Sequence, residues 1–238
     1  MGAEQAIRRR VRDPDKPRTP RQQARRDRIL METRRLIVAK GYEAVTMDDL
    51  AATSGVAKKT LYDIYGSKEA LLAACVDQRV SEVFTRIEAA LTGRGVERLL
   101  AILARTAEAV MQEPLLQRAL EPVLLSHLSQ FDVVRVFREL HKGCLLEIAA
   151  AEEWDPAVDV DFIARNLLVD HIALENWWAA GIIDGDELRA FSLLNACRIL
   201  LPVTRGAARR TVEAHIAELQ QDLKGWRWGL SADEPGAA

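Results

Sequence analysis

Several ingredients are scarce in this 238-residue chain. It contains three Cys, eight Pro and thirteen Gly, and aromatic residues make up 5% of it. So few turn-forming residues argue against an all-β sandwich or barrel, which needs a turn about every 8–12 residues. Cys75, Cys144 and Cys197 are odd in number and widely spaced, so a disulfide framework is not expected and a reducing compartment fits better.

Long apolar runs are also missing. The first residues carry charges with no apolar segment behind them, which does not fit a signal peptide. No stretch approaches the roughly 18 uncharged apolar residues that a membrane helix needs. The sequence therefore predicts a cytoplasmic protein without a membrane partner.

The composition that is present fits a helix-rich globular protein, with 49% hydrophobic and 29% charged residues. The net charge of −2 hides an asymmetry: residues 1–70 hold 16 Lys and Arg against 10 Asp and Glu, whereas the remainder is acidic. A basic end on an acidic chain is the pattern expected of a polyanion-binding head carried by a body with other partners.

The apolar spacing predicts an all-α chain without strands. Residues 1–20 are rich in Arg and Pro and lack an apolar face, which predicts a disordered basic arm, and residues 231–238 predict a flexible tail. Gly41, Gly55 and Gly66 separate the first helices. The expected helices span 21–40, 46–54, 58–65, a long segment after Ser67, and then 95–111, 115–130, 132–152, 156–180, 186–204 and 208–224.

The strongest motif lies in residues 47–66, where a helix-turn-helix is predicted. Ala51 supplies the small residue at the helix crossing, and Gly55, four residues later, supplies the left-handed turn. Leu50 and Leu61 stand at core-facing positions. Thr46 and Asp49 provide an N-cap signal for the first of the two helices.

Residues 46–72, TMDDLAATSGVAKKTLYDIYGSKEALL, and the helix before them resemble the DNA-binding domain of the TetR/AcrR family of transcriptional regulators. The resemblance covers about residues 25–72. It implies an N-terminal three-helix DNA-binding head over 21–66 and a C-terminal helical ligand-binding and dimerisation domain over 67–230. Departures occur at Lys59, Ile64 and Tyr65, where many members have other residues, and the first of these predicts a different base preference.

The expected DNA contacts follow from the recognition-helix geometry. Lys58 and Lys59 stand at the N-terminus of this helix and are candidates for guanine or phosphate contacts. Hydroxyls that can donate to phosphate are present at Thr46, Thr60 and Tyr62, and a lysine stands in the first turn of the next helix. The set of predicted DNA-binding residues is Thr46, Lys58, Lys59, Thr60, Tyr62, Tyr65 and Lys68. For Tyr65, packing between head and body is the preferred role and a phosphate contact the second.

A head this small reads one half-site, so a homodimer is expected to bind a palindromic double-stranded DNA operator. The segments 156–180 and 186–204 are apolar around most of their circumference, as expected for helices buried on two sides. The family resemblance likewise implies dimerisation through the last two long helices. Binding to DNA would place the protein at the nucleoid.

The same resemblance implies a small-molecule inducer pocket in the body, whose position the sequence does not fix. His141 and Cys144 share one helical face, but no third or fourth ligand is evident, so no metal site is predicted, and no cofactor. Unusual residues in the relevant segments are the candidate ligand contacts. These are Phe131, Phe137, His141, Cys144, His171, Asn176, Trp177 and Trp178.

The sequence therefore predicts a DNA-binding transcriptional regulator, a repressor released by a small apolar ligand. The alternative is a DNA-binding regulator controlled by a protein partner or by cysteine oxidation. An enzyme is not predicted and no catalytic residue is assigned, because nucleophile-elbow, phosphate-loop and zinc-protease motifs are missing.

Overall fold

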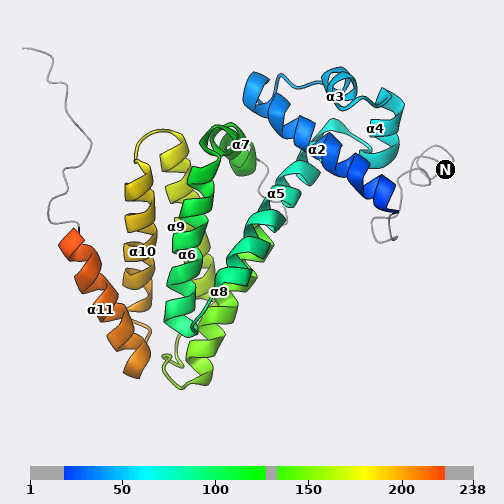
Figure 1. Cartoon of the computed structure of the whole chain (residues 1–238). Helices are drawn as coiled ribbons and strands as arrows, with labels where there is room; N and C mark the ends of the chain where they lie inside the picture. Colours follow the sequence, from blue (N-terminus) through cyan, green and yellow to red (C-terminus); the bar gives the residue numbers. More distant parts are fainter. Residues whose placement is uncertain (1–18, 127–132, 223–238) are drawn as a thin grey trace, which may run out of the picture. The chain divides into compact units, whose positions relative to one another are not determined.

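The computed structural model describes residues 19–126 and 133–222, and these residues are helical without a strand (Figure 1). Backbone pairing within them is limited to one isolated bridge between Trp154 and Thr204. The predicted all-α class is thereby confirmed. The helices are α2 (Pro20–Lys40), α3 (Met47–Ser54), α4 (Lys58–Tyr65), α5 (Lys68–Ala90), α6 (Gly95–Gln112), α7 (Pro114–Ser126), α8 (Val133–Ala150), α9 (Val160–Ala179), α10 (Gly185–Leu200) and α11 (Gly206–Asp222).

Contacts among the helices divide the chain into two compact units. The head unit comprises the described parts of residues 1–86 and 113–134, and the body unit those of 87–112 and 135–238. Gly66-Ser67 does end one helix and start the next, where the sequence placed the boundary between the two expected domains. The division instead falls inside α5, because most of α5 and all of α7 pack with the head.

The head unit has one hydrophobic core built by five helices. Side chains of α2, α3, α4, α5 and α7 converge in it, and burial of each such residue contributes about 1.5–3 kcal/mol. Its buried members include Ile29, Ile37, Leu50, Leu61, Leu71, Leu72, Leu116 and Leu120.

Polar contacts also join α2 to α5 beside this core. The Arg34 guanidinium donates to both carboxylate oxygens of Glu82, at 3.0 and 3.2 Å, and to Gln78 Oε1 at 3.3 Å. Gln78 in turn donates to Asp27 Oδ1 at 3.1 Å. The geometry of the fork-like pair fixes the rotation of α2 against α5.

The start of α2 differs by one residue from the expected one. Pro20 is the first helical residue, and Thr19 caps it through a capping box with Gln22. Proline is favoured there because its missing N–H has no partner in the first turn anyway. Thr19 and Pro20, which were predicted to belong to the disordered arm of residues 1–20, thus start a helix, and residues 1–18 lie outside the described residues.

In the body unit α10 lies against α6, α9 and α11. Its inward side chains and those of α6 and α9 form a second core, in which Trp178 and Leu188 are 4% and 1% exposed. Gly185 starts α10 against Met111, where a Cβ atom would meet the Met111 side chain. A larger residue at this position would require the Met111 side chain to move.

The link between α8 and α9 departs from the sequence reading. Asp155-Pro156 was expected to start the helix, but α9 starts at Val160 with Asp159 as its N-cap. Asp155 Oδ1 instead accepts from the Ala157 N–H at 3.0 Å, closing a local turn that competes with a helix start. At the end of α8, Glu152 takes φ 62°, the only positive φ of a non-glycine residue in the described part of the chain.

Candidate nucleic-acid interface

The helix α3 is fixed at its first turn by a reciprocal cap. Thr46 Oγ1 accepts from the Asp49 N–H at 3.1 Å, and the Asp49 carboxylate accepts from the Thr46 N–H at 3.1 Å. Lys40 Nζ donates to the same carboxylate at 2.6 Å. These hydrogen bonds, Lys40 first, lower the pKa of Asp49 to about 2. The Thr46 hydroxyl is thus already used in positioning α3.

The turn between α3 and α4 has the geometry that the sequence predicts. Gly55 adopts φ 65° and ψ 36°, the left-handed conformation, and its N–H donates to the Ala51 carbonyl. Leu50 and Leu61 are buried on the two sides of the turn, with exposures of 1% and 0%. Together these features form a helix-turn-helix with α4 as its second helix.

The N-terminus of α4 is open. Ala57 precedes it in an extended conformation and no side chain caps the first N–H groups. Unpartnered N–H groups and the helix dipole favour an anion at this position, and a phosphate is the natural one.

The two lysines at this end differ in their surroundings. Lys58 Nζ donates to Asp48 Oδ2 at 2.8 Å, and this hydrogen bond raises the pKa of Lys58. Lys59 is exposed and has no ion-pair partner within the described residues. The sequence pattern alone does not identify Asp48, because the turn brings together residues ten positions apart. The signal available for it was an acidic residue in the first turn of α3.

The other predicted contacts on α4 also divide into two groups. Tyr62 is 44% exposed, whereas Tyr65 is 7% exposed and packs in the head core. The Arg26 guanidinium lies 4.7 Å from the centroid of the Tyr65 ring. Packing is thus the role that fits Tyr65, and its burial argues against the phosphate contact. Thr60 is half-buried beside them.

Lys68 is the last of the predicted DNA contacts. Its Nζ donates to the Glu43 carbonyl oxygen at 3.0 Å and lies 5.9 Å from the centroid of the Tyr42 ring. The lysine therefore connects the start of α5 to the loop before α3. Ser67 caps α5 by accepting from the Ala70 N–H at 3.1 Å.

Among the ligand candidates, the structure brings together three rings of α8 and α9. The Phe137 centroid lies 4.7 Å from that of His171 and 6.2 Å from that of His141, and the two histidine rings are 6.3 Å apart. His171 Nε2 lies 3.3 Å from Glu175 Oε1. Burial, with a smaller effect from His171, lowers the pKa of His141 to about 3, so its imidazole is neutral.

The remaining candidates do not join this cluster. Trp177 is 48% exposed, and Trp178 packs with α6 and α10 in the second core. Asn176 is half-buried. Cys144 is 2% exposed, and burial raises its pKa to about 11. Phe131 lies outside the described residues.

The described residues contain no group of three His, Cys, Asp or Glu side chains that could hold a metal ion. None of their helices is both long enough and apolar enough to cross a bilayer.

A helix-turn-helix whose second helix has an uncapped N-terminus, within a helical unit separate from the body unit, is typical of helix-turn-helix DNA-binding proteins. Residues 29–75 match the family model described as "Bacterial regulatory proteins, tetR family". These residues carry the DNA-binding domain of TetR-family transcriptional regulators, and the comparisons support a regulator of this family. Members of the family are transcriptional regulators, not enzymes.

Sequence identity to individual relatives is higher over a short match than over a long one. The chain is 52% identical over 56 residues to the HTH-type transcriptional regulator YvaF of Bacillus subtilis, a match covering 24% of this chain and 29% of YvaF. It is 27% identical over 180 residues to the HTH-type transcriptional repressor KstR2 of Mycolicibacterium smegmatis, covering 69% and 85% of the two chains. The chain thus spans less than a third of YvaF.

Solved structures with this fold include SmeT, the repressor of the Stenotrophomonas maltophilia multidrug efflux pump SmeDEF. The TM-score is 0.63 at 18% identity, with 77% of this chain and 92% of SmeT covered. At this identity the likeness concerns the fold.

Proposed function

We propose that the protein is a homodimeric repressor that binds a palindromic operator and leaves it when a small apolar ligand enters the body. The observation that carries the proposal is the exposed, uncapped N-terminus of α4 with Lys58 and Lys59 beside it. Repression as the mode is supported by KstR2, which is named a repressor.

The contacts of α4 support different roles on DNA for its side chains, some contacting bases and others contacting phosphates. Lys59 has its ammonium free for a base edge or phosphate, whereas Lys58 is held by Asp48 at 2.8 Å. The exposed Tyr62 hydroxyl suits a phosphate, which fixes register and not sequence. Thr60 adds a second hydroxyl on this helix, and Thr46 and Lys68 position the neighbouring backbone.

An exposed apolar face on α9 supports the dimer. Phe162, Val169 and Trp177 are 62%, 67% and 48% exposed. Their spacings of seven and eight residues keep them on one side of a helix with 3.6 residues per turn. A contiguous apolar stripe of this kind is typical of a protein interface. A second copy seated there would supply the second recognition helix.

The interior of the body supports a ligand site between α8 and α9. His141 is fully buried, and neither ring nitrogen has a hydrogen-bond partner in the described structure. A neutral imidazole carries one N–H and one lone pair, and leaving them unpaired costs about 1–3 kcal/mol. A mostly apolar ligand with one polar group near His141 and Phe137 would remove this cost. The raised pKa and burial of Cys144 favour this control over cysteine oxidation, because the thiolate is the reactive form.

Selection of bound duplexes from a random library, at two salt concentrations and with the full chain, tests the DNA-binding part. We expect an enriched palindrome whose binding falls steeply with salt. Lys59→Ala should relax preference at one or two base pairs by about 1–3 kcal/mol. Tyr62→Phe should weaken binding to all DNA sequences alike. Reversed effects, or only non-specific binding by the unaltered chain, would contradict the proposal.

A further inference from the structure

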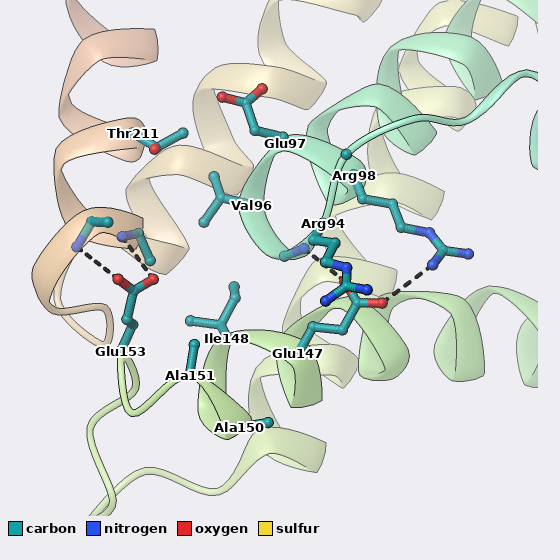
Figure 2. A pocket seen from close by; sticks show the side chains of 14 residues that line it. Arg94, Val96, Glu97, Arg98, Glu147, Ile148, Ala150, Ala151, Glu153 and Thr211 are labelled. Atoms are coloured by element: carbon teal, nitrogen blue, oxygen red, sulfur yellow. Dashed lines mark hydrogen bonds and ion pairs between the residues drawn. The ribbon is translucent and has the colours of Figure 1, made fainter.

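A pocket of about 500 Å³ opens in the body unit, where three helix ends meet (Figure 2). Its walls are the start of α6, the end of α8 and the start of α11. None of the predicted ligand contacts lines it, so it is separate from the interior around His141. Sites for small molecules typically have volumes of about 300–1,000 Å³.

The pocket's two helix starts are already occupied by carboxylates of the chain itself. Glu147 accepts from the Gly95 N–H at 2.8 Å and from Arg98 at 3.2 Å. Glu153 accepts from the N–H groups of Ala207 and Ala208 at 2.9 and 3.1 Å. These contacts satisfy one N–H group at the start of α6 and two at the start of α11, and each places a carboxylate where the helix dipole favours an anion.

One cationic group at the pocket remains without a counter-charge. Arg94 is exposed, and its guanidinium makes no ion pair or hydrogen bond with the described residues. Figure 2 shows it on the same side of the pocket as Arg98, with Val96, Ile148 and Ala151 towards the middle. The pocket therefore has the Arg94 guanidinium at one end, beside the Arg98–Glu147 ion pair, and an apolar floor next to it.

This arrangement matches a molecule with one anionic end and an apolar remainder. Val96 and Ile148 are buried at 4% and 2% exposure, so they present a fixed surface rather than a mobile one. A planar guanidinium pairs with a carboxylate through two parallel hydrogen bonds. We propose that this pocket is a second small-molecule site, specific for small amphipathic monocarboxylates, with Arg94 binding the carboxylate.

The test measures binding directly on the full chain without DNA. Octanoate is titrated while the methyl NMR signals of Ile148 and Val96 are followed, and octanamide serves as the uncharged probe of the same length. We expect saturable shifts with octanoate and binding at least about tenfold weaker with octanamide, a difference of about 1.4 kcal/mol. Equal binding of the two probes, or no saturable shift, would overturn the proposal.

Variants locate the site. Arg94→Glu should weaken octanoate about tenfold or more, and Arg94→Lys should retain part of the affinity because the charge remains. Arg105→Glu is the control, since Arg105 is an exposed arginine of α6, the helix that starts directly after Arg94, and it does not line the pocket. Ala151→Trp should block the pocket and abolish the methyl shifts. An unchanged affinity in Arg94→Glu, or an equal loss in Arg105→Glu, contradicts the assignment. Because no DNA is present, failure here is distinct from failure of the operator selection.

Discussion

The helix-turn-helix and the pocketed end of the body show two ways of ending helices. In the first, the partners are close in sequence: Thr46 with Asp49, Ser67 with Ala70, and Gly55 with Ala51. In the second, Glu147 and Glu153 cap α6 and α11 from 52 and 54 residues away. Helix ends of the head are thus encoded locally, whereas these ends of the body exist only once α8 is in place.

Both regions also contain a residue in the left-handed backbone conformation, but it is a glycine in the head and a glutamate in the body. Gly55 in the head has φ 65° and Glu152 in the body has φ 62°. At the end of α8, the Glu153 N–H donates to the Ile148 carbonyl oxygen at 3.2 Å and the Glu152 N–H to that of Ala149 at 3.0 Å. This hydrogen-bond pattern usually has glycine at the position of Glu152. The body accepts strain here, and the next residue, Glu153, caps α11.

The strongest test of the difference between the head and body units is whether they unfold independently of each other. Leu61→Ala removes a fully buried side chain from the head core, which should cost about 2–5 kcal/mol. Hydrogen exchange should quicken in α2 and α3 while α9 and α10 keep their protection, if the units are energetically separate. Lys59→Ala, on the exposed side of α4, is the control and should change stability by less than about 0.5 kcal/mol. Uniform loss of protection in both units would refute separate behaviour.

The body should show the larger response to acid. His141 titrates at a pKa of about 3 in the folded chain, against about 6.5 when unfolded. Between these values the unfolded chain binds the extra proton, so the free energy of unfolding falls as pH falls, by at most about 1.4 kcal/mol per pH unit. Urea unfolding from pH 7 to pH 5 should therefore reveal a loss of up to about 2 kcal/mol.

A substitution isolates this effect from that of other titrating groups. His141→Leu should flatten the pH dependence of unfolding between pH 7 and pH 5. His215→Gln is the control, since His215 is partly exposed beside Glu97 and Glu218. A slope unchanged in His141→Leu would assign the acid response to another group.

Substitutions at the two left-handed positions, Glu152 and Gly55, should change stability by smaller amounts and in opposite directions. Glu152→Gly relieves the conformation and should stabilise the body by up to about 1 kcal/mol, whereas Gly55→Ala should destabilise the head by about 1–2 kcal/mol. A Cβ atom at position 55 meets nothing within 4 Å, so backbone strain alone accounts for the expected cost. Thermal unfolding of both variants is the measurement, and shifts of equal sign would contradict the interpretation.

The smallest expected effect concerns Asp48. Asp48→Asn removes the exposed partner of Lys58, so Lys58 becomes available to phosphate. Binding of the selected operator should tighten a few-fold and its salt dependence should steepen, since one more lysine displaces counterions. Asp63→Asn on α4 is a control for the change in net charge. Equal gains in both variants would mean that the pairing with Lys58 has no role of its own.

What the sequence predicts well are the features whose partners lie within about four residues. The bounds of α4 and the cap of α3 agree with the expectation, as does the turn at Gly55. The expected helix start at residue 156 is wrong, because Asp155 forms a local Asx turn in place of a helix cap. The pairing of Lys58 with Asp48 and the neutral state of His141 depend on how separate helices pack. Residue types along the chain do not carry that information.

The three buried thiols have a practical consequence for measuring this protein. Cys75, Cys144 and Cys197 are 0%, 2% and 0% exposed, and burial raises the pKa of each to about 11. Maleimide reagents attack the thiolate, so these cysteines should remain unlabelled in the folded chain near neutral pH. A single cysteine introduced at Lys59 would then carry the only fluorophore or spin label. The distance between two such labels reports directly on how far apart a pair of recognition helices stands, with and without a candidate effector.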